Sequence, residues 1–481
     1  MAVLSHLNPK KFFQFFEEIC GIPHGSSNVE AISDYLVDFA RKRQLEVIQD
    51  HVKNVIIIKE ASKGYEQEPP VILQGHMDMV AVHKPNLDID MTKDPLKLVV
   101  DGDKVYADGT SLGGDDGIAV AYAMAILDDD TLQHPRLEVV ITVDEETGMV
   151  GAREIDLSML KGKRMLNLDS ETEGVFLTSC AGGAKVRCGL EFQPVERTGY
   201  LYEIAVNGLQ GGHSGGEIHK ERGNANLLIA RFLWNIIHMD PGLVSCQGGL
   251  ADNAIPRETV AQLIIPEEKQ QEFMLAAETF SGIVQSELAA RDPGFQFRVE
   301  MKGIGQDVCV AGADLKKAVA LLLSLPNGVQ AMSADMPGLV ETSLNLGILT
   351  ITAQSLQADY AVRSSIESRK EALLKTMEAV CYLAGASYSS RDSYPGWAYR
   401  VNSPLRDKMI AVYEEMYGEK PKVDAVHAGL ECGLLASKIE DLDGVALGPN
   451  AHFIHTTEEY LSIVSVARVW EYLIRLLARK G

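Results

Sequence analysis

Residues 54–180 alternate short apolar runs with helical stretches. Runs rich in Val, Ile and Leu are separated by helical stretches such as residues 117–130. Strands that alternate with helices are typical of a largely parallel sheet flanked by helices. The strand-like runs are residues 54–60, 70–80, 137–146, 162–170 and 174–180.

The same rhythm returns near the carboxyl end. Residues 403–417 have a helical pattern, two strand-like runs follow at 421–429 and 444–450, and residues 456–480 form a long amphipathic pattern. We expect residues 1–182 and 396–481 to complete one α/β domain together.

Residues 183–395 read differently. Strand-like runs at 199–209 and 257–266 precede a long helical pattern at 267–291, which predicts an inserted α+β domain. After residue 310 an order of helix, two strands, helix and strand recurs with slight sequence similarity, which suggests an internal repeat.

Composition narrows the class of protein. The 481 residues are 46% hydrophobic and 23% charged, with 45 basic against 67 acidic side chains and a net charge of -22. This balance indicates a globular protein with no nucleic acid and no anionic membrane as partner. We expect a cytoplasmic protein, because no secretion signal or membrane-spanning run is evident and the seven cysteines include no Cys-x-x-Cys pair.

Histidine and acidic residues follow the strand-like runs. His76 and Asp78 alternate at the end of one run and therefore share a face of the strand. Asp78 is placed to hold the second ring nitrogen of a metal-binding His76. Taken alone, such a pair is more often incidental than functional.

Two adjacent acids, Asp115 and Asp116, follow a glycine-rich turn and begin a helix, where backbone N–H groups favour negative charge. Asp116 has a plain alternative role as a helix cap. That role leaves Asp115 without an explanation.

Asp144, Glu145 and Glu146 close the apolar run that begins at residue 137, and Asp169 closes the next. Neighbouring carboxylates repel one another unless a cation neutralises them, so this pattern favours a metal over a merely polar rim. Oxygen and imidazole ligands without thiolate suit Zn²⁺, with Mn²⁺ and Co²⁺ as alternatives.

The motifs GHMDMV, GGDDG, VDEETG and NLDS, with GGHSG and HTTEE further along, resemble the M20 metallopeptidases in order and spacing. The segments LQGGHSGGEIHKERGNANLL, DNAIPRE and HAGLECG are most similar to the aminoacyl-histidine dipeptidase branch of that family. The resemblance spans the whole chain and implies a catalytic α/β domain with an inserted lid domain.

The resemblance also implies a site with two zinc ions. One metal would be held by His76, Asp115 and Asp169, and the other by Asp115, Glu146 and His455, with Asp115 bridging. Asp78 would orient His76, Glu145 would be the general base, and the peptide bond between Asp115 and Asp116 would be cis. The HTTEE motif departs from the commoner His-Ser-Pro-x-Glu form, and nearby His452 offers an alternative to His455.

His213 in the GGHSG motif resembles the lid histidine that polarises the scissile carbonyl. An ordinary loop histidine beside flexible glycines is the plain alternative. Candidates for gripping a substrate carboxylate are Asn253, Arg363, His427 and Gly429. The guanidinium of Arg363 suits that task because its planar fork matches a carboxylate.

We therefore expect hydrolysis of dipeptides, including Xaa-His dipeptides, within cytoplasmic peptide degradation. An amidohydrolase acting on another small N-acyl or aminoacyl amide is the alternative on the same fold. A catalytically silent peptide-binding protein is disfavoured, because Glu145, the proposed ligands and His213 are all present. The partners expected are small peptide substrates, and a homodimer through the lid domain.

Overall fold

The computed structural model describes residues 3–481, which form two compact units. Unit 1 contains the chain up to Ser179, Tyr399–Ala425 and Leu430–Gly481, and unit 2 contains Cys180–Ala398 and Val426–Gly429. The two ends of the chain thus build one unit and the middle builds the other. Residues 426–429 group with unit 2, although the residues on either side belong to unit 1.

The main sheet of unit 1 has the strand order β1-β2-β6-β3-β7-β21-β8-β20. Strands β6, β3, β7 and β21 pair in parallel at its centre, whereas β1, β2 and β8 pair antiparallel toward the edges. The predicted α/β class is confirmed, with the parallel pairing confined to the centre. The elements of unit 1 are α1 (Lys10–Cys20), α2 (Glu30–Lys42), β1 (Glu46–Gln49), β2 (Val55–Lys59), β3 (Val71–His76), β4 (Leu98–Asp101), β5 (Lys104–Ala107), α3 (Gly114–Leu127), β6 (Leu137–Thr142), α4 (Val150–Glu154), β7 (Arg164–Asn167), β8 (Val175–Cys180), α9 (Pro404–Tyr417), β20 (Lys422–Val426), α10 (Glu431–Lys438), β21 (Asp443–Ala446), β22 (Ala451–His452), β23 (Tyr460–Ser462) and α11 (Ile463–Ala478).

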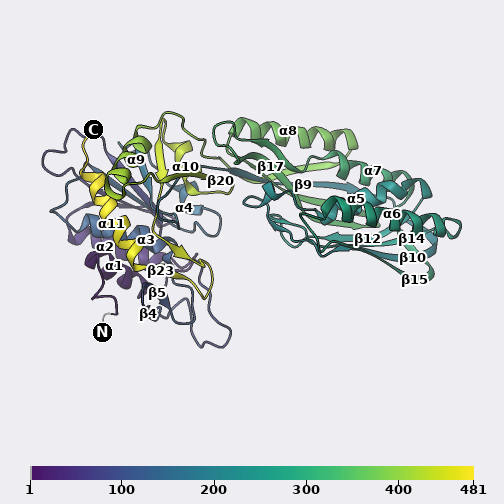
Figure 1. The fold of residues 1–481 in the computed structure, drawn as a ribbon, viewed down its shortest axis with the longest axis horizontal. Helices are drawn as coiled ribbons and strands as arrows, with labels where there is room; N and C mark the ends of the chain where they lie inside the picture. The colour runs from purple at the N-terminus through teal and green to yellow at the C-terminus, as the bar shows by residue number, and fades with distance from the viewer. Residues whose placement is uncertain (1–2) are drawn as a thin grey trace. The chain divides into compact units, whose positions relative to one another are not determined.

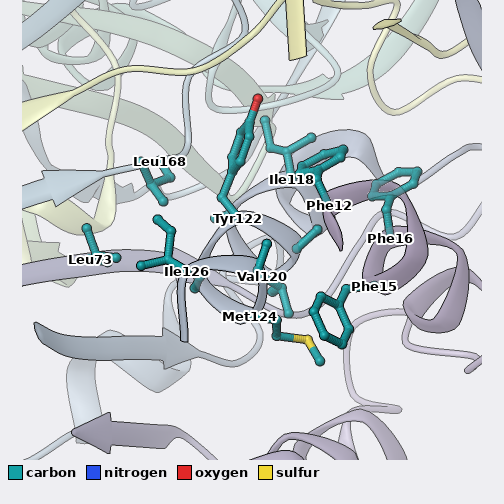
Figure 2. Packing of buried hydrophobic residues seen from close by; sticks show 14 of the residues in the cluster. Phe12, Phe15, Phe16, Leu73, Ile118, Val120, Tyr122, Met124, Ile126 and Leu168 are labelled. Atoms are coloured by element: carbon teal, nitrogen blue, oxygen red, sulfur yellow. The ribbon is translucent and has the colours of Figure 1, made fainter. Parts of the chain in front are cut away.

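Helix α3 lies at the centre of the unit 1 core. Its sequence is apolar on all faces, which is the pattern of a fully buried helix. Figure 2 shows its side chains between Phe12 and Phe16 of α1 and Leu73 and Leu168 of the sheet region. Burial on every side fixes the position of α3, and with it the acidic turn where the helix begins.

A smaller sheet in unit 1 carries the region of the HTTEE motif. Its strand order is β22-β23-β5-β4, and Tyr460 of β23 pairs with Tyr106 of β5. His455 lies in the connection between β22 and β23. This sheet therefore holds the last predicted ligand independently of the main sheet.

Unit 2 is built on one large antiparallel sheet, with helices α5 to α8 gathered along one of its faces (Figure 1). Apolar side chains between these helices and the sheet form a separate core. The elements of unit 2 are β9 (Gly182–Glu191), β10 (Val195–Asn207), β11 (Gly212–His213), α5 (Ala225–Ile236), β12 (Gly242–Gly248), β13 (Ala254–Ile255), β14 (Thr259–Ile265), α6 (Gln270–Leu288), β15 (Gln296–Cys309), α7 (Gly312–Ser324), β16 (Gly328–Met332), β17 (Val340–Thr352), β18 (Ser355–Ser364), α8 (Glu367–Ala384) and β19 (Ser387–Tyr394).

The order of elements repeats within unit 2. If the short strands β13 and β16 and the 3-10 helices are left out, the series α5, β12, β14, α6 and β15 is followed by α7, β17, β18, α8 and β19. In the sheet, β15-β10-β14-β12 on one side mirrors β19-β9-β18-β17 on the other, and the two halves meet where β12 pairs with β17. The repeat expected from the sequence is confirmed in the order of these elements.

No helix within residues 3–481 is both long enough and apolar enough to cross a membrane.

Candidate metal centre and substrate-binding residues

The carboxyl ends of the central parallel strands gather the acidic and imidazole side chains of unit 1. His76 is the last residue of β3, Asp169 lies just beyond β7, and Glu145 and Glu146 lie in the turn after β6. Because β6, β3 and β7 are parallel neighbours, these ends meet at one edge of the sheet. That edge is where α/β proteins bind their ligands.

Asp115 and His455 reach the same place from other elements. The two carboxylate oxygens of Asp115 face different histidines, with Oδ1 3.1 Å from Nε2 of His76 and Oδ2 3.1 Å from Nε2 of His455. Nε2 of His455 is also 2.7 Å from Oε1 of Glu146. Asp115 is therefore placed between the two imidazoles, as a bridging ligand would be.

Two sets of potential ligand atoms, each within 4.8 Å of one another, occur among the described residues, and both include His76. One adds Asp115 and Glu146, and the other adds Asp116 and Asp169. Neither His452 nor His455 is in these sets, and the ring of His452 packs against Tyr460 at 4.7 Å between centroids. His452 and His455 were alternative metal ligands in the sequence, and His455 is the one that contacts the acidic cluster.

Asp116 is the member of these sets that sequence reasoning did not propose as a ligand. Its Oδ2 accepts the backbone N–H of His76 at 3.1 Å and its Oδ1 accepts that of Ala119 at 3.2 Å. The second bond caps the regular part of α3, because the backbone of Asp115 and Asp116 is not helical. The Asp115–Asp116 peptide bond is cis, as predicted.

Gly75 allows the start of α3 to approach the sheet closely. A Cβ atom at this position would lie 2.3 Å from Oδ2 of Asp116 and 2.3 Å from Cβ of Ala119. Any larger residue would push the acidic turn away from β3. The glycine before His76 is therefore part of the geometry that brings Asp115 to the histidine.

The protonation of the cluster shows an excess of negative charge. Burial, reinforced by Asp115, raises the pKa of Asp169 well above its usual value. Burial opposes the charged form of His76, but its hydrogen bonds to Asp115 and Asp78 outweigh this and raise its pKa well above the usual value. The neighbouring carboxylates of Asp115 and Glu146 raise the pKa of His455 to about 10. Protons thus neutralise carboxylates that a bound cation would otherwise neutralise.

These residues fit a metal centre. Oε1 of Glu146 is buried and accepts no hydrogen bond, although Nε2 of His455 lies 2.7 Å away. A buried carboxylate oxygen without a partner is costly unless a cation occupies the place of the missing donor. The donor set of imidazole nitrogens and carboxylate oxygens is one that Zn²⁺ accepts.

Asp78 and Ser26 support His76 from behind. Nδ1 of His76 is 3.0 Å from the backbone oxygen of Asp78 and 3.4 Å from its Oδ1, so Nδ1 is the protonated nitrogen and Nε2 is left to face the metal position. The carboxylate of Asp78 also accepts the backbone N–H of Glu145 at 3.0 Å and the hydroxyl of Ser26 at 2.8 Å. Asp78 therefore orients both His76 and the turn that contains Glu145.

Glu145 is half-buried in the turn directly before the proposed ligand Glu146. Burial raises its pKa to about 8; His76 opposes this shift, while Glu431 and Glu146 add to it. A carboxyl group that holds a proton near neutral pH is suited to general acid–base chemistry.

Two buried glutamates were not predicted as functional residues from the sequence, although the motifs HTTEE and HAGLECG contain them. Glu459 of HTTEE accepts the backbone N–H groups of Leu112, Gly113 and Gly114 at 2.8, 3.2 and 2.8 Å. It thereby ties the segment of His455 to the turn that presents Asp115. Glu431 of HAGLECG is fully buried in unit 1, and burial raises its pKa to about 7.

Unit 2 brings His213, Arg363 and His427 together. Nδ1 of His213 accepts the backbone N–H of Gly216 at 3.0 Å, so the proton of the neutral ring is on Nε2. That nitrogen lies 3.4 Å from Nη2 of Arg363. Two donors that face each other without an acceptor form a site for a carbonyl or carboxylate oxygen.

Further polar atoms of this cluster lack partners. Nε of Arg363, Nδ1 of His427 and Oγ of Ser214 are buried without a hydrogen bond, while Nε2 of His427 is 2.7 Å from Oγ of Ser343. Burial and the positive charge of Arg363 lower the pKa of His213 and lower that of His427 to about 3. The cluster has an excess of positive charge and of donors.

The remaining predicted residues contribute backbone rather than side chain. The carbonyl of Asn253 accepts the N–H of Ser214 at 2.8 Å, and its own side chain is exposed. Gly429 packs so closely on Tyr394 that a Cβ would lie 2.9 Å from the ring. A Cβ on Gly215 would lie 2.2 Å from the carbonyl oxygen of His427, so this glycine lets the cluster close.

An α/β fold with imidazoles and carboxylates at the carboxyl edge of its parallel strands, and with a second α+β unit inserted, defines a metal-dependent hydrolase. The sequence model of peptidase family M20/M25/M40 matches residues 72–479, and the chain belongs to this family. The resemblance stated from the motifs is confirmed.

Known proteins are similar over the full length. The cytosol non-specific dipeptidase of Escherichia coli (strain K12) is 36% identical over 481 residues, which is 99% of each chain. The crystal structure of aminoacylhistidine dipeptidase from Vibrio alginolyticus has a TM-score of 0.94 and 36% identity, covering 99% of this chain and 98% of that one. Aminopeptidase PepT from Bacillus cereus shares the fold, with a TM-score of 0.58, 16% identity and 98% of each chain covered.

Proposed function

We propose that this protein hydrolyses dipeptides, including Xaa-His dipeptides, with two zinc ions. The observation that carries the proposal is the position of Asp115, whose two oxygens face His76 and His455 separately. The names of the two full-length relatives, a non-specific dipeptidase and an aminoacylhistidine dipeptidase, support the choice of substrate.

In this proposal His76, Asp115 and Asp169 hold one metal, and Asp115, Glu146 and His455 hold the other. Bound zinc would activate the attacking water and polarise the peptide carbonyl. Mn²⁺ and Co²⁺ accept the same donor set and are the alternatives. Asp116 is left out of the ligand set, because backbone N–H groups occupy both of its oxygens.

Glu145 is the general base in this mechanism. In its carboxylate form it takes a proton from the attacking water and later delivers that proton to the leaving amine. Asp78 serves by orientation, because it binds both Nδ1 of His76 and the backbone N–H of Glu145.

Unit 2, as the lid, supplies the donors that recognise the substrate. The protonated Nε2 of His213 donates to the scissile carbonyl oxygen as negative charge develops there. Arg363 binds the substrate carboxylate, supported by His427 and by the backbone positions of Asn253 and Gly429. The unpartnered donors of this cluster favour an anionic ligand.

We further propose residues 183–395 as the extent of the lid, a homodimer through that domain, and a cytoplasmic place in peptide degradation. The mass of the purified protein in solution tests the dimer. Truncation at the proposed boundaries, followed by a measurement of cooperative unfolding, tests the extent of the domain.

Activity is tested by incubating zinc-loaded protein with a panel of Xaa-His and other dipeptides, tripeptides and N-acyl amino acids. We expect free dipeptides to be cleaved fastest and a chelator to stop the reaction. Cleavage of N-acyl amino acids alone would assign the protein to the amidohydrolases. Absence of turnover with both metals bound would leave only peptide binding.

A further inference from the structure

Glu431, the first residue of α10, is a fully buried carboxyl that makes no direct hydrogen bond to the proposed metal ligands. Its Oε2 accepts a hydrogen bond from Nε2 of Gln74 at 2.7 Å and another from the hydroxyl of Thr142 at 2.5 Å. These two partners belong to different strands, β3 and β6. One carboxylate oxygen therefore joins a helix to two strands of the sheet.

The network continues into a third strand. Oε1 of Gln74 accepts a hydrogen bond from Nδ2 of Asn167 in β7 at 2.6 Å. Gln74 and Asn167 are direct partners in the β3–β7 register, and Thr142 is the partner of His76 in the β3–β6 register. All of these side chains are buried, so water does not compete for their hydrogen bonds.

The residues of this network lie one or two positions before proposed site residues, or before the turn that carries them, in the sequence. Gln74 precedes His76 by two positions, and Asn167 precedes Asp169 by two. Within a strand, residues two apart project from the same face, so Gln74 and His76 share a face of β3, whereas Asp169 lies just beyond the end of β7. Thr142 ends β6, directly before the turn that carries Glu145 and Glu146.

We propose that Glu431 is a positioning residue that holds the carboxyl ends of β3, β6 and β7 in the arrangement required for metal binding. The inference rests on the proposed function. Glu431 acts through Gln74 and Thr142, which fix the strand ends that present His76, Asp169 and the Glu145–Glu146 turn. Residues behind metal ligands typically change metal affinity or activity by about 10–100-fold when they are removed.

The essential feature of Glu431 is an acceptor for two donors. Glu431→Leu has a similar size but removes the acceptor of the Gln74 amide, and it leaves the hydroxyl of Thr142 only the carbonyl oxygen of Gly75 at 3.2 Å. Glu431→Gln keeps one carbonyl oxygen that both donors can reach. The pair of variants therefore separates loss of hydrogen bonding from loss of the ionisable group.

The decisive experiment measures Zn²⁺ affinity by competition with a chromophoric chelator, together with kcat and KM for a cleaved dipeptide. We expect Glu431→Leu to weaken Zn²⁺ binding and to lower kcat by about 10–100-fold each, with a smaller change in KM. Glu431→Gln should recover most of both losses. Equal losses in the two variants would overturn the hydrogen-bonding role.

Glu138 provides a matched control in the same unit. It is also a fully buried glutamate on β6, but it binds Arg136 and the backbone N–H of Gly162 instead. Glu138→Leu should lower the melting temperature and leave the Zn²⁺ affinity of the folded protein unchanged. If it weakens Zn²⁺ binding as much as Glu431→Leu does, general destabilisation explains both and the proposal fails.

Gln74→Met tests the same network from its centre if Glu431→Leu does not fold. It should weaken Zn²⁺ binding in the folded protein, and unchanged affinity would overturn the proposal. The metal measurement also separates the two hypotheses. Wild-type protein that binds zinc without cleaving dipeptides contradicts the proposed function only, whereas active wild type with an unaltered Glu431→Leu variant contradicts this inference only.

Discussion

The polar cluster at the edge of the unit 1 sheet has too few hydrogen-bond donors, whereas the polar cluster around Gly215 in unit 2 has too few acceptors. In unit 1, carboxylates outnumber donors, and the pKa values of Asp169, Glu145 and both site histidines are raised. In unit 2, donors outnumber acceptors, and the pKa values of His213 and His427 are lowered. The first cluster requires cations and the second requires an anion or a carbonyl.

In the proposed function, the two clusters have different tasks. A metal centre needs acceptor atoms held close together against their mutual repulsion, and the main sheet supplies them from adjacent strand ends. A carboxylate site needs donors held apart from competing acceptors, and His213, Arg363 and His427 supply them around Gly215. Each cluster is unfavourable without its ligand, which is the usual state of a preorganised site.

Removal of the bridging carboxylate should give the largest effect. Asp115→Ala removes the oxygens that face His76 and His455, so we expect loss of tightly bound zinc and no measurable turnover. Metal analysis after dialysis, together with a peptidase assay, checks this. Asp144→Asn is the control, because Asp144 has a left-handed backbone that Asn tolerates and belongs to neither candidate ligand set. Zinc retained in full by the Asp115 variant would refute the bridging assignment.

Loss of the proposed base should leave the metal centre in place. Glu145→Gln keeps the size of the side chain but cannot accept the proton, and general bases contribute about 10²–10⁴-fold to rate. We expect kcat to fall by about that factor with zinc content unchanged. A variant that retains full activity would exclude Glu145 as the base.

Acid should weaken unit 2 through His427. The pKa of this buried imidazole is lowered from 6.5 to about 3, so the unfolded chain binds one more proton between those values. The stabilising contribution is complete above pH 6.5 and is lost as the pH falls toward 3, with an upper limit of about 5 kcal/mol.

His427→Gln should therefore flatten the dependence of unfolding free energy on pH in this range. Denaturant titrations at several pH values check the prediction. His238→Gln, at an exposed position of the same unit, serves as the control. Identical pH profiles for wild type and His427→Gln would show that the imidazole is not buried in its neutral form.

Removal of the proposed carboxylate anchor should give the smallest effect. Arg363→Met removes a charged hydrogen bond worth about 1.5–3 kcal/mol, so KM for a dipeptide should rise by about 10–100-fold. Dipeptide amides should be poor substrates of the wild type and lose little more in the variant. Arg187→Met changes an exposed arginine paired with Asp359 and should leave KM unchanged. If amides and free dipeptides lose equally in Arg363→Met, the arginine does not bind the carboxylate.

The parts of the fold with strong periodicity were predictable. Continuous apolar runs identified the central strands, and residues 117–130 were identified as a helix, because these patterns leave few alternative elements. The antiparallel edges of the main sheet were not predictable, since strand direction depends on partners far away in the sequence.

The candidate site was predictable only in part. Four site residues could be predicted from the sequence, because each follows an apolar run and lies near a strand end: His76, Glu145, Glu146 and Asp169. Asp116 and Glu431 look like ordinary helix-start acids in the sequence. Their roles depend on which strand packs beside them, as the contacts with His76 and Gln74 show.

The sequence by itself determined the α/β class, the inserted unit and the set of residues that resembles the M20 peptidases. These follow from local periodicity and from motifs whose order and spacing can be read directly from one sequence. Tertiary structure alone decided that His455 meets Asp115 across 340 positions and that Arg363 meets His213 across 150. Such contacts arise because burial of apolar faces fixes where distant elements pack, and only then do opposite polar groups come within reach.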